Sequence, residues 1–344
     1  MEKKKVLVAM SGGVDSSAAA LLLQRQGYHC DGAMLDLLPQ GNDTTDGRAV
    51  AERLGMQFYV LPCAAQFRRD VMDRFISEYC AGRTPNPCID CNRCLKFGTF
   101  LERALEMGYD YIATGHYARV ATEKTTGRRV LLRGLDRSKD QSYMLCQLTQ
   151  RQLQHLLLPV GDYEKSDVRA IAREAGLRNA DKADSQDICF IPDGDYTAFL
   201  RENGVELTEG NFVDCTGKVL GRHKGLPCYT MGQRKGLGVS AGKHVYVVSK
   251  NAEDNTILLG DEEDLYTDTL TACRVNWCSG HAPAEPIRCT AKTRYSQTEA
   301  AATAEALPEG RLRLVFDEMQ RAVTAGQAVV LYNGDEVLGG GTIE

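Results

Sequence analysis

Several features are missing from the sequence, and each absence excludes a class of protein. No apolar run approaches the roughly 20 residues that a membrane helix needs. The apolar stretch near the start, residues 6–10, is too short for a secretion signal. The 344 residues are 43% hydrophobic and 25% charged, which is typical of a soluble globular protein of two or three domains. We therefore expect a cytoplasmic protein in a reducing compartment, without membrane association.

Cysteine, in contrast, is abundant. The chain has 13 cysteines, an odd number, which argues against a full disulfide framework and favours metal binding or thiol chemistry for some of them. Cys30, Cys63 and Cys146 have apolar neighbours in the sequence, so we predict that they are core residues.

Three further cysteines lie in RTPNPCIDCNRCLKFG, residues 83–98. This stretch lacks the fourth ligand of a closed zinc site. It also lacks the fourth cysteine of a ferredoxin-type run, since that position is Gly98. Cys88, Cys91 and Cys94 therefore need a further ligand or a reaction partner from elsewhere, and the candidate is Cys189 in DSQDICFIP, residues 184–192.

The alternation of strand and helix patterns predicts the domain organisation. Apolar runs at 6–10, 28–37, 58–63 and 111–117 read as strands, with helices at 16–27, 47–55 and 67–81, and another reaching Met107. Two more helices are expected at 149–158 and 166–176, the second with Ser166 as its N-cap. This pattern predicts an α/β fold with a doubly wound parallel sheet. Past residue 203, short strands separated by glycines predict a small central β-rich module and a C-terminal β-barrel, with domains at 1–203, 204–268 and 269–344.

Charge is distributed unevenly, although the net charge of −5 argues against a uniformly basic nucleic-acid-binding protein. Basic clusters at 128–139 and 221–236 could face phosphates. A solvated loop surface is the simpler interpretation of each cluster taken alone.

The segment SGGVDSS, residues 11–17, follows a buried strand and opens a helix. Its glycines allow a tight turn, and the helix start offers unpaired N–H groups, so we predict a phosphate-binding loop. It lacks the lysine of a Walker A loop and does not match G-x-G-x-x-G. The motif resembles the PP-loop of the ATP pyrophosphatase superfamily, which implies cleavage of ATP between its α and β phosphates.

A second resemblance covers essentially the whole chain. The runs RTPNPC..CN...KFG, YIATGHYARV, LLRGLDRSKDQSYML, DSQDICFI, YTMGQRKGLG, AKTRY and TAGQAVVLYNG occur in the order found in the bacterial tRNA-specific 2-thiouridylase family. The resemblance implies ATP-dependent 2-thiolation of the wobble uridine of tRNA, with the lysine, glutamate and glutamine tRNAs as substrates. It also implies adenylation of the base O2, sulfur transfer from a cysteine persulfide, and a cysteine desulfurase or sulfur-relay protein as partner.

The resemblance assigns roles to particular residues. Cys91 would be the nucleophile and Cys189 the persulfide carrier, and the release of sulfur would join them in a disulfide bond. Residues that would bind ATP with Mg²⁺ are Ala9, Met10, Ser11, Gly12, Gly13, Val14, Asp15, Ser16, Leu35 and Gly115. Residues that would contact the target base are Asn86, Pro87 and Cys88. Residues that would contact tRNA are His116, Lys139, Asp140, Gln141, Arg294, Tyr295 and Gln327.

One departure leaves the sulfur chemistry open. Many family members have aspartate where this chain has Cys88, and that aspartate is proposed to assist proton transfer. As an alternative, Cys88, Cys91 and Cys189 could bind a [4Fe-4S] cluster whose fourth iron holds a sulfide. Cys94 has no family counterpart, and a helix thiol without a role is the simpler interpretation. The competing functions are a PP-loop enzyme that adenylates a metabolite and a non-catalytic RNA-binding metalloprotein.

Overall fold

Five parallel strands form the sheet of the N-terminal part of the chain. The computed structural model describes residues 3–182, 188–240 and 242–344. The sheet has the order β3-β2-β1-β4-β7, so the chain moves outward from β1 in one direction and later returns to its other side. The carboxyl ends of β1 and β4 therefore flank a topological switch point, where open α/β sheets bind ligands. The strands are β1 Lys5–Ala9, β2 His29–Asp36, β3 Phe58–Pro62, β4 Tyr111–Ala113 and β7 Leu156–Leu157.

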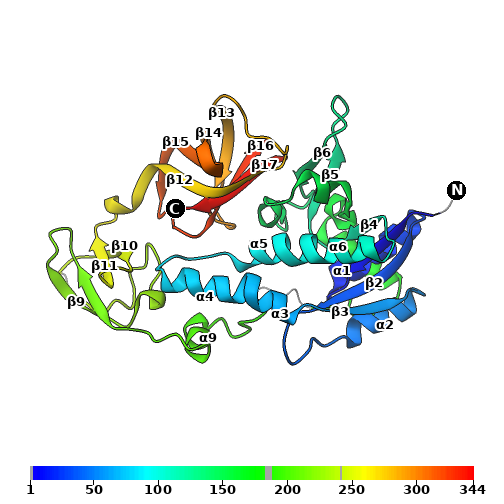
Figure 1. Ribbon diagram of the computed structural model, residues 1–344, viewed down its shortest axis with the longest axis horizontal. Coiled ribbons are helices and arrows are strands. Elements are labelled where there is room, and N and C mark those ends of the chain that lie inside the picture. Colours follow the sequence, from blue (N-terminus) through cyan, green and yellow to red (C-terminus); the bar gives the residue numbers. More distant parts are fainter. Residues whose placement is uncertain (1–2, 183–187, 241) are drawn as a thin grey trace.

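Helices cover this sheet, and two of them are long composites. The first runs through α3, the π-helical η1 and α4, and the second through α5, the π-helical η2 and α6 (Figure 1). The second composite packs on the first where α5 meets η1. The helices are α1 Val14–Arg25, α2 Thr45–Arg53, α3 Ala64–Phe67, η1 Arg68–Met72, α4 Asp73–Cys80, α5 Pro87–Cys91, η2 Asn92–Thr99, α6 Phe100–Glu106, α7 Gln150–Gln154, α8 Lys165–Glu174 and α9 Tyr196–Glu202. Short 3₁₀ turns are η3 Ser142–Leu145, η4 Pro159–Asp162, η5 Leu226–Cys228, η6 Glu263–Leu265 and η7 Pro308–Gly310.

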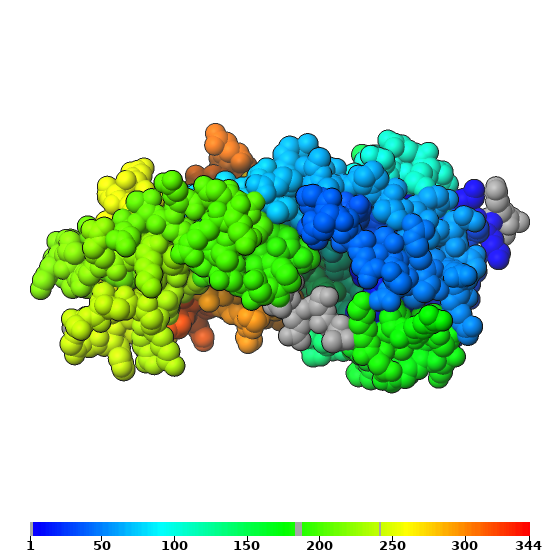
Figure 2. Space-filling model, turned by 90° about the horizontal axis from the view of Figure 1, so that it is seen from below, coloured from blue at the N-terminus to red at the C-terminus, as the bar shows by residue number. Residues whose placement is uncertain are grey.

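Two β structures follow, as the sequence predicts. The central module is a four-stranded sheet of order β10-β11-β8-β9 around a small core that includes Phe212 and Val247. Seen from below, it lies at the opposite end of the molecule from the α/β part (Figure 2). Its strands are β8 Gly210–Val213, β9 Val219–His223, β10 Tyr246–Asn251 and β11 Thr256–Gly260.

The C-terminal strands close into an antiparallel barrel because β12 pairs with both β15 and β17. Burial alternates along much of β15, so that one face lines the barrel core. The strands are β12 Tyr266–Trp277, β13 Ile287–Lys292, β14 Ala300–Leu307, β15 Arg311–Arg321, β16 Ala328–Asn333 and β17 Glu336–Ile343. The predicted parallel sheet, β-rich module and barrel are thus confirmed.

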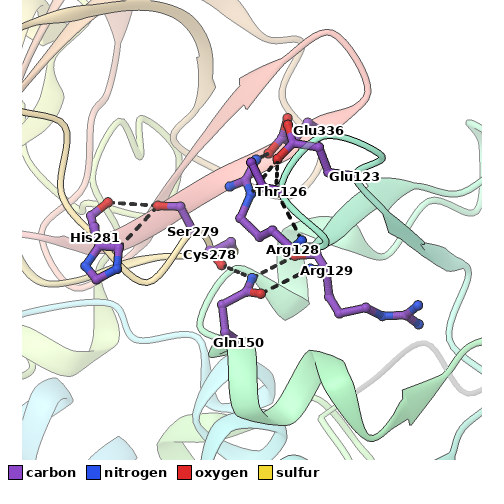
Figure 3. A network of polar contacts seen from close by, with 9 residues as sticks. All are labelled: Glu123, Thr126, Arg128, Arg129, Gln150, Cys278, Ser279, His281 and Glu336. Carbon is purple, nitrogen blue, oxygen red and sulfur yellow. Dashed lines mark hydrogen bonds and ion pairs between the residues drawn. The ribbon is translucent and has the colours of Figure 1, made fainter.

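A hairpin of the α/β part joins it to the barrel. Strand β6, Arg129–Arg133, pairs with β5, Ala118–Thr122, on one side and with β17 on the other. Arg128 donates to Glu336 at 2.8 Å, and Gln150 Nε2 donates to the carbonyls of residues 129 and 278 at 2.7 and 2.6 Å (Figure 3). Much of the basic cluster at 128–139 is therefore used in this joint and faces acids of the barrel, since Arg133 pairs with Glu299 and Arg137 with Asp335.

Three local predictions were wrong. The helix expected at 149–158 ends at Gln154, because the fully buried Leu156 and its neighbour pair with β4 as an edge strand. Ser166 is not an N-cap, since α8 already begins at Lys165. The strand expected at 111–117 stops at Ala113, after which Thr114 turns its hydroxyl to the ring of His116 at 2.8 Å.

The prediction of three cysteines in the core is confirmed. Cys30, Cys63 and Cys146 are buried, and all 13 cysteines are unbonded. Within the described ranges, no helix combines the length and the apolar character required to cross a bilayer.

Candidate active site

The loop between β1 and α1 lies at the switch point. Gly12 has a φ of +76°, and a Cβ at this position would come within 2.9 Å of the Asp46 Cβ, so both conformation and space require glycine. The hydroxyls of Ser16 and Ser17 both donate to the carbonyl of Gly13, at 3.1 and 2.9 Å. These hydrogen bonds therefore stabilise the shape of the loop without a ligand.

A distant asparagine supports the loop from behind. The buried Asn179 donates from Nδ2 to the Gly12 carbonyl at 3.0 Å and to the Ser17 hydroxyl at 2.8 Å. It follows α8 in the chain and is far from the loop in sequence. Sequence analysis did not single it out, because no local pattern marks a residue whose partners lie so far away.

Asp15, in the first turn of α1, is fixed by two residues from other elements. Lys165 donates to its two carboxylate oxygens at 2.7 and 2.8 Å, and the Tyr117 hydroxyl donates at 2.8 Å. The Lys165 side chain is 11% exposed, so this ion pair is largely shielded from water. A carboxylate at this place also interacts favourably with the helix dipole.

Gly115, directly after β4, closes the other side of the switch point. A Cβ on Gly115 would lie 2.6 Å from the Asp15 carbonyl carbon and from the Ser16 nitrogen, so its backbone packs directly on the start of α1. Leu35 lies near the carboxyl end of β2, at the same edge of the sheet. The fold thus brings the residues predicted to bind ATP, from Ala9 to Ser16 with Leu35 and Gly115, to one edge.

The cysteine stretch begins as a capped helix. Pro87 is at the first position of α5, and the Asn86 side chain accepts from the Cys88 N–H at 3.2 Å, a regular N-cap arrangement. Asn92 anchors the next turn by donating to the carbonyl of Met144 at 3.0 Å. The cysteines of this helix therefore project from a backbone that is fixed at two points.

The structure brings Cys189 to this helix. Cys91 is 7% exposed, whereas Cys88 and Cys189 are exposed. Burial raises the pKa of the Cys91 thiol to about 12. Lys96 opposes this rise, and Cys189, Cys88 and Cys94 add to it. Burial also raises the pKa of Cys189, with Cys88 again adding and Lys96 opposing. Cys189 and Cys88 therefore both act on Cys91, as does Cys94, which places Cys189 near the cysteine helix. Residues 184–187 of the DSQDICFI motif are outside the described residues.

Among residues 3–182, 188–240 and 242–344, no three His, Cys, Asp or Glu side chains are arranged to hold a metal ion. Cys94 is half-buried, and the charged groups that act on its thiol are Arg93, Asp90, Asp70 and Arg74.

His116 connects the cysteine helix to the phosphate loop. It directly follows Gly115, and its ring centre lies 5.7 Å from that of Phe97 in η2. Burial lowers the pKa of His116 well below its ordinary value, and Lys96 lowers it further, so the ring is neutral at pH 7. The two halves of the site are therefore in contact.

The residues predicted to contact tRNA form a connected band. Gln141 bonds to the backbone of Tyr117, next to His116, and Tyr295 donates to the Asp140 carbonyl at 3.1 Å. Arg294 donates to the Thr324 hydroxyl at 2.8 Å. Gln327, which follows in the same loop, donates to the Thr84 carbonyl at 2.8 Å. The band thus runs from the α/β part over the barrel and back to the segment before the cysteine helix.

Three residues of the site were missed by sequence analysis: Lys96, Asn179 and Lys165. Lys96 lies inside the KFG run, and its signal in the sequence is that reactive thiols usually have a cation nearby. Asn179 and Lys165 could not have been found in this way, because only the fold brings them to the loop.

A parallel sheet with a glycine- and serine-rich loop and a helix start at its switch point defines a class, the PP-loop type of α/β nucleotide-binding fold. Family models agree, since residues 4–193 match a tRNA methyl transferase HUP domain, residues 197–261 a tRNA methyl transferase PRC-barrel domain, and residues 267–343 an aminomethyltransferase beta-barrel domain.

Curated relatives identify the family within this class. The chain is 48% identical to the tRNA-specific 2-thiouridylase MnmA of Acetivibrio thermocellus, over 100% of both chains. It is also 48% identical to MnmA of Clostridioides difficile, over 99% of this chain and 98% of that one. The chain belongs to the tRNA-specific 2-thiouridylase family. A solved structure of a predicted tRNA methyltransferase subunit from Methanocaldococcus jannaschii is 18% identical, covers 50% of this chain and 75% of that chain, and has a TM-score of 0.32.

Proposed function

We propose that the chain is a tRNA-uridine 2-sulfurtransferase that uses ATP to replace the C2 oxygen of the wobble uridine with sulfur. The observation that carries the proposal is the gathering of Cys91 and Cys189, from distant parts of the chain, in a site that touches the phosphate loop through His116. The family assignment supports this function over adenylation of a metabolite.

The chemistry has two parts. The uridine O2 attacks the α-phosphorus of ATP, pyrophosphate leaves, and O2 carries the adenylate. The terminal sulfur of a persulfide on Cys189 then attacks C2, and AMP departs with the oxygen. The Cys91 thiolate attacks the Sγ atom of Cys189, which releases the thiocarbonyl sulfur to the base and forms a disulfide between the two cysteines. An external dithiol reduces this disulfide, and a sulfur donor such as a cysteine desulfurase or relay protein restores the persulfide.

Other residues would bind and orient the substrates. The loop from Ala9 to Ser16 would hold the triphosphate at the start of α1, with Mg²⁺ bound mainly through the phosphates. Leu35 and Gly115 would flank the nucleotide, and Asn86, Pro87 and Cys88 would meet the target base. The band from His116 to Gln327 would contact the tRNA, with the lysine, glutamate and glutamine wobble-uridine species as the proposed substrates.

Serine variants test the cysteine assignment. Purified protein carrying a persulfide, ATP and unmodified tRNA should give 2-thiouridine in one turnover, measured by mass spectrometry of nucleosides. Cys91→Ser and Cys189→Ser should each reduce the product below detection while ATP binding, measured by calorimetry, stays within about twofold of the wild type. Cys94→Ser is the matched control and should retain activity. Full activity in either of the first two variants would contradict the proposal.

The same preparations test the cluster alternative. We expect sulfur transfer by protein that contains neither iron nor acid-labile sulfide, purified with and without oxygen. A different result would favour the cluster. If activity requires bound iron, and Cys88→Ser loses both the iron and the activity, the sulfur source would be a cluster-bound sulfide and not a persulfide on Cys189.

A further inference from the structure

A loop of the barrel holds the connection between the two composite helices. This connection, residues 81–86, joins the end of α4 to the start of the cysteine helix and passes beneath the barrel in Figure 1. The Thr84 N–H donates to the Ala325 carbonyl at 2.9 Å, and the Gln327 Nε2 donates to the Thr84 carbonyl at 2.8 Å. Ala325 and Gln327 lie between β15 and β16, so one barrel loop binds both polar groups of the Thr84 backbone.

Gly326 lies between these two contacts and packs closely on the connection. Its φ is +89°, which residues with a side chain rarely adopt, and a Cβ here would lie 2.8 Å from the Thr84 nitrogen and 2.9 Å from the Arg83 Cβ. The loop itself is tied to β17, because the Gly326 N–H donates to the Ile343 carbonyl at 2.9 Å and the Ile343 N–H donates to the Gln327 carbonyl at 2.8 Å. Only glycine therefore allows this anchored loop to lie so close to Thr84.

The connection is also fixed on both sides of Thr84. On one side, the Arg83 N–H donates to the Glu78 carbonyl of α4 at 2.9 Å, and the Arg83 guanidinium pairs with the Glu78 carboxylate. On the other side, Pro85 alone separates Thr84 from Asn86, the residue that caps the cysteine helix. A displacement of Thr84 must therefore be taken up within two residues of the helix start.

A second contact links the same helix to the same part of the barrel. The Tyr143 hydroxyl, in η3, donates to the Ala328 carbonyl directly after the loop, at 2.8 Å. The next residue of η3, Met144, accepts from Asn86 through its sulfur at 3.5 Å and from Asn92 through its carbonyl at 3.0 Å. Both ends of α5 are therefore linked to the region where β16 begins.

We infer that Gly326 is a positioning residue, which sets where the cysteine helix begins relative to the rest of the site. The inference rests on the proposed function, in which the start of this helix meets the target base and Cys91 attacks from the same helix. The barrel then does more than contact tRNA, because its loop also places the helix that carries the chemistry. A small misplacement of a reacting group slows a reaction strongly and need not change the affinity for the substrate.

Gly326→Ala tests this inference, and Gly310→Ala is the matched control. Both glycines lie in barrel loops with a positive φ, +89° and +67°, but a Cβ on Gly310 would have no neighbour within 4 Å among the described residues. At saturating ATP and tRNA, we expect Gly326→Ala to slow single-turnover sulfur transfer at least about tenfold, because the helix start must shift. The dissociation constants of ATP and tRNA should stay within about twofold of the wild type. Gly310→Ala should match the wild type in all three measurements.

Amide hydrogen exchange of the free protein separates this inference from the proposed function, because it requires neither tRNA nor activity. In Gly326→Ala, exchange over residues 84–92 should become at least about tenfold faster, while α1 and the barrel strands exchange as in the wild type. In Gly310→Ala, the exchange of residues 84–92 should not change. If Cys91→Ser keeps its activity, the cysteine roles fail, but the exchange still shows whether the barrel loop fixes the helix.

Three results with folded Gly326→Ala would overturn the inference: transfer at the wild-type rate, a loss that consists only of weaker tRNA binding, or exchange that rises equally throughout the barrel. If this variant does not fold, Gln327→Leu takes its place, because it removes the amide that donates to Thr84 without adding a clash. Its exchange is measured in the free protein, where tRNA contacts have no effect. Faster exchange over residues 84–92 would support the inference, and unchanged exchange would overturn it.

Discussion

One lysine lies beside the phosphate loop and another lies in the cysteine helix, but the two have different surroundings. At the loop, Lys165 is bound to both oxygens of Asp15, and Tyr117 completes the group. At the cysteine helix, Lys96 opposes the rise in the pKa of Cys91, and it has no ion pair with a carboxylate among the described residues. The first lysine is therefore held in an ion pair before substrate arrives, whereas the second is not.

The difference matches the chemistry proposed for each region. A triphosphate brings its own permanent charge, so its loop needs a fixed framework of N–H groups more than a free cation. A buried thiol has no charge at rest, and burial raises the pKa of the Cys91 thiol to about 12. A nearby cation lowers the pKa of such a thiol and so favours the thiolate.

The largest expected effect is a difference in protein stability between variants of the two lysines. Lys165→Met leaves the Asp15 carboxylate shielded and without its cation, so we expect a loss of about 3 kcal/mol in the free energy of unfolding. Lys96→Met breaks no ion pair and should change it by about 0.5 kcal/mol or less. Urea denaturation followed by circular dichroism gives both values.

The double variant Asp15→Asn/Lys165→Met is the control for that prediction. It removes both charges, so it should be less destabilised than Lys165→Met alone. If Lys96→Met proves to be as costly as Lys165→Met, the proposed contrast between the two sites is wrong.

A smaller effect is expected where β4 meets the loop. In Gly115→Ala the new Cβ would meet the backbone of Asp15 and Ser16 at 2.6 Å, so the start of α1 must shift. We expect a loss of about 2 kcal/mol in stability and at least about tenfold weaker ATP binding, measured by calorimetry. Gly221→Ala is the control, because its Cβ would meet only the side chain of Val239, at 2.9 Å, in the central module. It should leave ATP binding unchanged, and an equal loss in both variants would show that the contact at Gly115 is not specific to the loop.

Sequence analysis could predict this site only where the signal is local. The SGGVDSS loop, the alternating strands and helices, and the three cysteines of one helix are local patterns, and the fold agrees with the first two. The pairing of Cys91 with Cys189 came from the family resemblance alone. Lys165 and Asn179 reach the loop because α8 packs against α1, and no residue pattern marks the π-helical turn that contains Lys96. The edge strand β7 was missed for a similar reason, since pairing with β4 outweighed a helical pattern.

The smallest expected effect concerns His116, which links the two regions. Its pKa in the folded protein lies well below the ordinary value of 6.5, so the unfolded chain binds a proton that the folded chain does not. Stability must therefore fall as the pH drops below 6.5, by up to about 1.4 kcal/mol per pH unit from this group. We expect the stability of the wild type relative to His116→Asn to decrease by about that amount between pH 7.5 and 5.5, measured by urea denaturation. His281→Asn, at an exposed loop position, should follow the wild-type profile. If the difference in the free energy of unfolding between wild type and His116→Asn stays constant with pH, the His116 ring can accept a proton in the folded protein. The contact between the loop and the cysteine helix would then be more open to water than the packing on Phe97 implies.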